Sequence, residues 1–175
     1  ILSTVGFMFG TGGSALVGRA FGEKKPDTAN RYFSLFVYVS LGIGILLSVI
    51  SFVFLRPICK LLGADGQLLE ECVLYGRIIL LALPFNILQF LFQSFCVTAE
   101  KPQLGLTTTL ASGITNMVLD AVLVILLPQQ LKLAGAAVAT AFSQVVGGAL
   151  PLIYFARPNS SILRLCKTSF DSNAL

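Results

Sequence analysis

The hydrophobic positions of this 175-residue chain gather into five long runs, which short polar segments separate. A helix needs about 20 apolar residues to cross a bilayer, so each run is long enough for one transmembrane helix. We therefore expect helices at about 1–21, 30–62, 66–98, 103–127 and 133–156, and a polar cytoplasmic tail at 157–175. A membrane β-barrel would show short alternating segments instead. The pattern predicts an all-α membrane protein with five transmembrane helices.

The connectors between the runs carry residues that end and begin helices. Pro26 suits the first turn of the second helix, Gly63 suits its C-terminal cap, and Asp65 suits the N-cap of the next helix. No connector is long enough to separate domains. The chain has no initiator Met and begins inside an apolar run, so we expect it to be a fragment of a longer protein.

Composition supports a membrane protein and weakens other classes. The chain is 55% hydrophobic and 11% charged, whereas soluble domains are about 25% charged. Its net charge of +4 comes from residues at the ends of the apolar runs rather than from one exposed patch, so nucleic acid is not an expected partner. There is no His and no closely spaced Cys pair, so neither a zinc site nor an enzyme active site is expected.

The basic residues divide unevenly between the two sides of the predicted bundle, which gives its orientation. One side collects Arg19, Lys24, Lys25, Arg31, Lys101, Arg157, Arg164 and Lys167. The other side collects Arg56, Lys60, Arg77 and Lys132. The positive-inside rule therefore predicts that the first side is cytoplasmic.

Asp120 is the one charged residue between Pro102 and Leu131. A carboxylate at the centre of a bilayer costs roughly 2.5–3.5 kcal/mol and usually marks an ion or substrate pathway. Asn116 lies one helical turn earlier, and Ser112 and Thr109 continue the same polar stripe. The stripe predicts a cation or proton site that faces a water-filled lumen. The alternative is a hydrogen bond that joins two helices.

Two other helices carry polar groups that could meet this stripe. Thr140 and Gln144 lie one turn apart in the fifth helix, on a face with Ala136 that could meet Asn116 and Asp120. In the third helix, Gln89 and Gln93 follow Pro84, which interrupts helical hydrogen bonding. The expected substrate-lumen residues are Gln89, Gln93, Thr109, Ser112 and Gln144. The small residues of the first and fifth helices favour close packing instead.

Four segments resemble the multidrug and toxic compound extrusion (MATE) transporters. They are GGSALVGRAFGEKK at 12–25, LLGA at 61–64 followed by Tyr75, NMVLD at 116–120 and AGAAVAT at 134–140. They occur in the family's order and with its spacing, and the similarity covers nearly the whole chain. Each motif alone is weak, and the set together is fairly specific.

The resemblance implies a twelve-helix antiporter with two six-helix lobes, in which this chain supplies helices two to six of the N-terminal lobe. Helix one and the C-terminal lobe would be its partners, together with a small-molecule substrate and the bilayer. Such proteins export amphipathic, often cationic, drugs or toxic metabolites, driven by H⁺ or Na⁺. The implied location is the cell membrane, as in a prokaryotic inner membrane.

The same resemblance implies roles for particular residues. Asn116 and Asp120 match the cation site of many prokaryotic members, and Thr140 matches a threonine of helix six. The implied coupling ion is H⁺ or Na⁺, with no other metal or cofactor. Two alternatives remain open: a lipid-linked oligosaccharide or lipid-precursor flippase of the same superfamily, and a structural membrane protein without transport activity.

Overall fold

The computed structural model describes residues 2–157 and 161–166. They form five α-helices and one 3-10 turn: α1 (Leu2–Gly22), α2 (Pro26–Leu61), α3 (Gly66–Thr98), α4 (Pro102–Leu126), η1 (Gln129–Leu131) and α5 (Lys132–Ala156). The expected all-helical fold is confirmed. The second helix begins at Pro26, four residues before the expected position, because the proline occupies its first turn. Parts of the expected tail, residues 158–160 and 167–175, lie outside the described residues.

Four of the described helices, α2 to α5, are long and apolar enough to cross a membrane. The fifth expected span, α1, is 21 residues long but does not reach the same hydropathy. Its sequence is rich in glycine, serine and threonine, which lower its mean hydropathy without shortening the helix. The same small residues allow α1 to pack closely on its neighbours.

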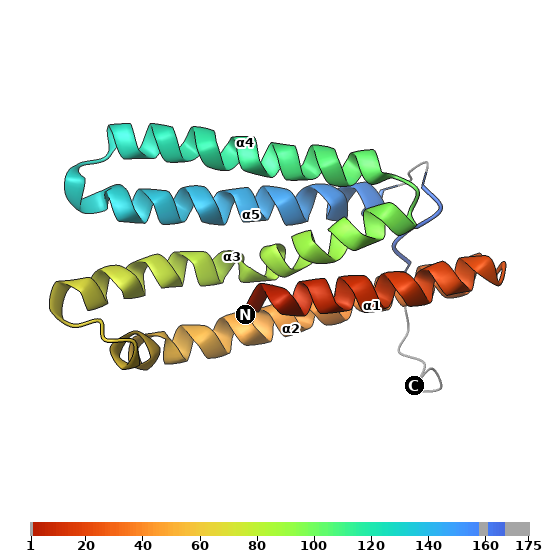
Figure 1. Ribbon diagram of the computed structural model, residues 1–175, viewed down its shortest axis with the longest axis horizontal. Helices are drawn as coiled ribbons and strands as arrows, with labels where there is room; N and C mark the ends of the chain where they lie inside the picture. The colour runs from red at the N-terminus through yellow and green to blue at the C-terminus, as the bar shows by residue number, and fades with distance from the viewer. Residues whose placement is uncertain (1, 158–160, 167–175) are drawn as a thin grey trace.

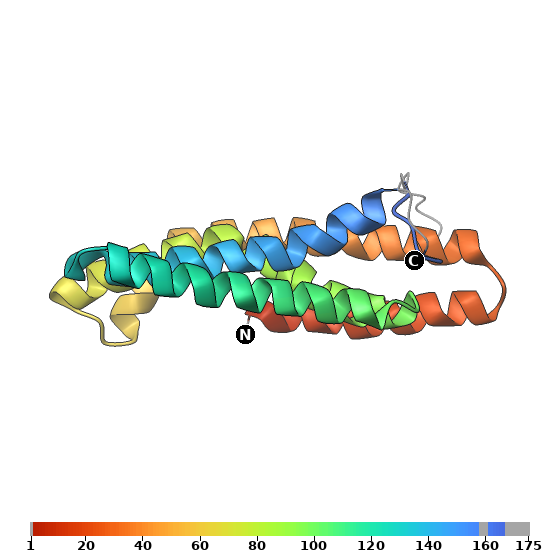
Figure 2. The ribbon, with the colours of Figure 1, turned by 90° about the horizontal axis from the view of Figure 1, so that it is seen from above.

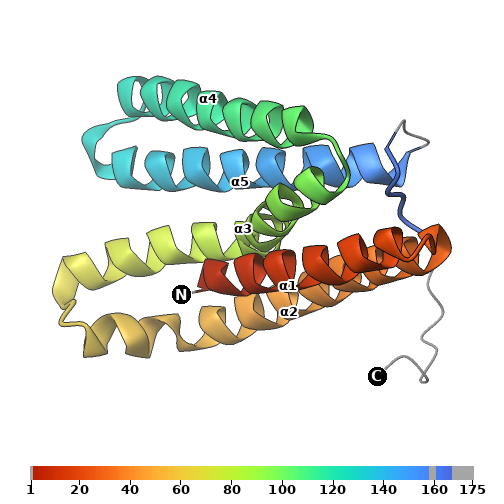
Figure 3. The ribbon, with the colours of Figure 1, turned by 45° about the vertical axis from the view of Figure 1, so that its right-hand side comes forward.

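The helices lie lengthwise, with α3 between the α1–α2 pair and the α4–α5 pair (Figures 1 and 3). α3 packs against α1, α2 and α5, whereas α4 packs mainly against α5. The α1–α2 and α3–α4 connectors and the end of α5 share one end of the bundle (Figure 2). This end carries most of the basic residues, so we call it the basic end; the described members are Arg19, Lys24, Lys25, Arg31, Lys101, Arg157 and Arg164.

Glycines allow α3 to contact two neighbouring helices at the level of the backbone. A Cβ atom added at Gly6 of α1 would overlap the carbonyl oxygen of Ile87, and one added at Gly148 of α5 would overlap that of Phe85. Small residues drive helix association in membranes because they allow this close approach. The close packing expected of the small residues in the first and fifth helices is therefore confirmed at these positions.

The α2–α3 connector ends α2 as the sequence predicts. Gly63 has φ +90°, its N–H donates to the carbonyl of Lys60, and the N–H of Ala64 donates to that of Cys59. This pair of bonds is a Schellman motif, which needs a residue in the left-handed region. Asp65 takes the N-cap position of α3 with an extended backbone, but its side chain makes no capping hydrogen bond.

α3 changes direction near its middle, close to Pro84 (Figure 1). Proline has no N–H, so the carbonyl of Leu80 loses its helical partner. The hydroxyl of Ser48 in α2 donates to this carbonyl at 2.5 Å. The local interruption that the sequence predicts is thus present, and a neighbouring helix satisfies the freed acceptor.

The segment after α5 closes the basic end of the bundle. Leu163 is completely buried in the cluster around Phe33, whose ring makes edge contacts with Phe95 and Phe155 at centroid distances of 5.0 and 5.1 Å. The segment is also held by hydrogen bonds from its backbone. The N–H groups of Arg164, Leu165 and Cys166 donate to Asn30 Oδ1, the Phe155 carbonyl and Ser34 Oγ, at 2.9, 3.1 and 2.9 Å.

Candidate cation and substrate site

The antiparallel pair α4–α5 brings the two predicted polar faces together. Ser112 Oγ donates to the carbonyl of Ser143 at 2.8 Å, and Asn116 Nδ2 donates to Thr140 Oγ1 at 3.4 Å. One turn of α4 therefore pairs with one turn of α5 running in the opposite direction. The meeting of the Asn116 and Thr140 faces, which the helical spacing predicts, is confirmed.

Asp120 lies one turn beyond Asn116 on α4 and is half-buried. The register set by the two pairs above places it opposite Ala136, whose side chain offers no hydrogen bond. No hydrogen-bond donor or cation of the described residues contacts the Asp120 carboxylate. The carboxylate, the Asn116 amide and the Thr140 hydroxyl thus follow one another along a single interhelical seam. Oxygen atoms of these kinds are the ligands that hard cations prefer.

Three of the five predicted lumen residues meet in a small cavity between α3, α4 and α5. Gln89, Gln93 and Thr109 contribute to its lining, together with the ring of Phe92. Gln93 Nε2 donates to Thr109 Oγ1 at 3.3 Å, which links α3 to α4. The lining of the cavity therefore includes neutral hydrogen-bonding groups and an aromatic ring, and none of the described side chains that form it is charged.

The other two predicted lumen residues have different surroundings. Ser112 is buried, and its hydroxyl is engaged by the backbone of α5. The side-chain oxygen Oε1 of Gln144 is buried and has no hydrogen-bond donor in the part of the chain that the structure describes. Ser112 thus joins two helices, while Gln144 holds an acceptor that is open to a further donor.

The sequence did not indicate the role of Gly147 in this cavity. A Cβ added at Gly147 would lie 2.5 Å from Cδ and Oε1 of Gln89. The glycine therefore leaves the space that the Gln89 amide occupies against α5. The small-residue pattern of the fifth helix predicted a close approach there, but it contained nothing to identify glutamine as the partner.

Comparison with known proteins places these features in a family. The MatE family model matches residues 1–122. The chain is 33% identical over 162 residues to the multidrug export protein MepA of Staphylococcus haemolyticus, covering 93% of this chain and 35% of that protein. It is 31% identical to MepA of Staphylococcus saprophyticus, again over 93% of this chain and over 36% of the relative. The chain thus spans about a third of the length of these relatives.

Solved structures agree on the fold. The inward-facing conformation of a multidrug resistance MATE family transporter of the MOP superfamily superposes with a TM-score of 0.86 at 18% identity, over 94% of this chain and 37% of that one. MATE in the bent conformation gives the same TM-score and identity, over 96% of this chain and 37% of that one. With a family model that matches most of its length, the chain belongs to the MATE transporter family.

Proposed function

We propose that this chain forms most of the N-terminal lobe of an antiporter that exports amphipathic, cationic drugs or toxic metabolites across the cell membrane. Protons or sodium ions moving inward would drive the export. The names of the staphylococcal relatives, which are multidrug export proteins, support drug efflux. The observation that carries the proposal is the seam on which Asp120 follows the hydrogen-bonded pair Asn116–Thr140.

In this proposal Asp120 binds the coupling ion as a carboxylate, or carries the coupling proton. The side-chain oxygen Oδ1 of Asn116 and the hydroxyl oxygen of Thr140 supply neutral ligands beside it. An ion shifts a conformational equilibrium only by the difference between its affinities for the two states. The α4–α5 seam must therefore open or close around Asp120 as the transporter alternates between its two sides.

The cavity between α3, α4 and α5 would supply contacts to the cargo. Gln89, Gln93 and Thr109 offer hydrogen bonds without a positive charge. The basic residue of α3, Arg77, lies over the Phe52 ring at 5.2 Å, near the opposite end of the bundle. A lining without Lys or Arg suits cationic cargo better than a lipid diphosphate, which a flippase would carry.

The proposal is tested by Asp120→Asn in the transporter that contains this lobe. Reconstituted vesicles would be given a sodium or proton gradient, and the gradient-driven export of a fluorescent cation would be measured. Asp120→Asn should abolish driven export, because the amide cannot carry the ion's counter-charge, while the melting temperature stays close to that of the unmodified protein.

Asp65→Asn is the matched control, because Asp65 is exposed in the α2–α3 connector and makes no capping bond. It should leave export unchanged. Normal export by Asp120→Asn would end the proposal. Normal export combined with a lowered melting temperature would show that Asp120 joins helices and has no part in transport.

A further inference from the structure

A cavity of about 300 Å³ lies at the basic end, between the last turns of α1 and the first turns of α2. Its lining includes Leu16, Arg19, Glu23, Lys25, Thr28 and Tyr32. It is separate from the α4–α5 seam and takes no part in the function proposed above. Both the charges and the position of this cavity point to a ligand.

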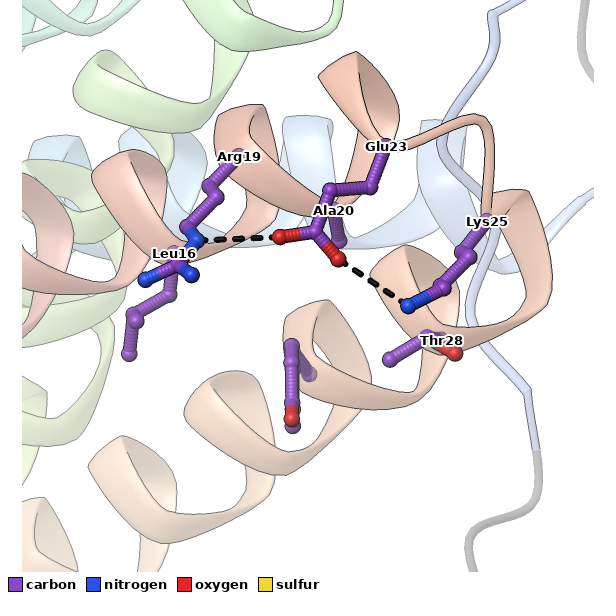
Figure 4. Close-up of a pocket in the computed structure, with 7 residues that line it drawn as sticks. Leu16, Arg19, Ala20, Glu23, Lys25 and Thr28 are labelled. Carbon is purple, nitrogen blue, oxygen red and sulfur yellow. Dashed lines mark hydrogen bonds and ion pairs between the residues drawn. The ribbon is translucent and has the colours of Figure 1, made fainter.

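One carboxylate in the lining of this cavity pairs with two cations (Figure 4). Glu23 accepts from Arg19 Nε through Oε1 and from Lys25 Nζ through Oε2, both at 3.0 Å. The hydrogen bond from Lys25, and then that from Arg19, keep the pKa of the Glu23 carboxyl below its ordinary value. Glu23 is therefore ionised at neutral pH and pairs with both cations at the surface.

The two cations retain most of their hydrogen-bonding capacity. A guanidinium has five N–H donors and an ammonium has three, and Glu23 accepts one from each group. The three charges leave a net positive charge of one at the cavity. Thr28 and Tyr32 of α2 also line the cavity, and each carries a hydroxyl group. This donor set matches an anion with several oxygen atoms, such as a phosphate.

The position of the cavity coincides with the expected surface of the membrane. The apolar part of α2 begins at Tyr32, directly after Arg31, and continues without a charge until Arg56. Tyrosine is enriched where a bilayer meets water. Leu16, one turn inside Arg19 on α1, is 49% exposed and belongs to the apolar side of this boundary. A ligand in the cavity would thus have its charge at headgroup depth and an apolar part beside Leu16.

We propose that this cavity binds the phosphate of an anionic phospholipid headgroup in the cytoplasmic leaflet. Arg19 and Lys25 donate to the phosphate oxygens, Thr28 and Tyr32 donate to the phosphate or glycerol oxygens, and an acyl chain runs along Leu16. Such a lipid fixes the α1–α2 connector to one leaflet. The site selects phosphatidylglycerol over phosphatidylcholine, because the choline group would place a further positive charge beside Arg19 and Lys25.

The test compares lipid binding by the protein purified in detergent. Native mass spectrometry would count bound phosphatidylglycerol and phosphatidylcholine over a concentration series. We expect each of the two cations that contact the phosphate to contribute about fivefold in affinity, so Arg19→Gln/Lys25→Gln should bind phosphatidylglycerol about 25-fold more weakly. Arg31→Gln is the control, because Arg31 is an exposed cation at the same end that does not line the cavity. It should change affinity by less than about twofold.

Competition with soluble glycerol phosphate separates a lipid site from a site for free phosphate. We expect no displacement of phosphatidylglycerol by glycerol phosphate at equal concentration, because the soluble anion lacks the contact with Leu16. Equal displacement would overturn the lipid assignment. Undiminished binding by the double variant, or an equal loss in Arg31→Gln, would overturn the site. Circular dichroism at 222 nm would verify that each variant keeps its helices.

Discussion

The hydroxyl of Ser48 replaces the hydrogen bond that Pro84 removes from α3. In a bilayer an unpaired carbonyl costs several kcal/mol, because no water reaches it. Ser48 lies on α2, 32 positions from Leu80 in the chain, and still donates to its carbonyl at 2.5 Å. A residue on a neighbouring helix thus permits the bend in α3.

This arrangement predicts a specific dependence between two substitutions. Ser48→Ala should lower the free energy of unfolding by about 1 kcal/mol rather than by the full cost of an unpaired carbonyl, because the unfolded chain in a membrane also finds partners for its polar groups. In a Pro84→Ala background the same change should cost much less, because residue 84 then provides an N–H to Leu80. Thermal unfolding of the four proteins in detergent would give the coupling energy. A cost for Ser48→Ala that is equal in both backgrounds would contradict this account.

Among the elements, α3 holds the bundle together. It packs on α1 and α2 on one side and on α5 on the other. Gly6 of α1 and Gly148 of α5 each bring a helix backbone against a carbonyl of α3. Two close crossings of one helix require glycine at defined positions of its two neighbours.

Gly148→Ala should therefore separate α3 from α5. The added Cβ would overlap the Phe85 carbonyl oxygen, so we expect a loss of about 1–3 kcal/mol in stability. Gly113→Ala on α4 is the matched control, because a Cβ there meets no atom of the described residues within 4 Å. It should be neutral or stabilise by up to about 1 kcal/mol, since alanine favours a helix over glycine. Equal melting temperatures for the two variants would refute the close crossing.

At the scale of the whole molecule, the segment after α5 joins elements that are far apart in the sequence. Its Ser161 hydroxyl donates at 3.3 Å to the carbonyl of Ala99, which caps the end of α3, and its backbone N–H groups donate to Asn30 and Ser34 of α2. Leu163 inserts between these helices and α5. Residues 161–166 thereby link α2, α5 and the end of α3 at the basic end.

Removal of this apolar anchor should loosen the basic end. Leu163→Ala should destabilise the protein by about 2–5 kcal/mol, the usual range for emptying a buried leucine site. Ile162→Ala should cost far less, because Ile162 is 42% exposed. Hydrogen exchange would locate the effect, with faster exchange of the Leu165 and Cys166 amides in Leu163→Ala alone. Unchanged protection of these amides would show that Leu163 does not hold the segment.

Local rules of the sequence accounted for much of the fold and part of the site. Run length gave the number of helices, because the bilayer sets the length of an apolar span. A helix often ends at a residue with left-handed backbone conformation, which glycine adopts readily, and this predicted the C-terminal cap at Gly63. The helical period placed Asn116 and Asp120 on one face. The same period placed Thr140 on a face that does meet Asn116.

Tertiary structure decided which faces meet and which polar groups are used. A helical period defines the face of a helix but not the helix that packs against it. The hydrogen bond from Ser48 to the Leu80 carbonyl and the close contact of Gln89 with Gly147 were therefore not predictable. Ser112 belonged to the predicted polar stripe, yet its hydroxyl donates a hydrogen bond to the backbone carbonyl of Ser143 in α5 and does not face a lumen. The burial of Leu163 depends on helices more than 130 positions away in the chain. Contacts of this kind exist only once the chain has folded, because they join residues that no local pattern connects.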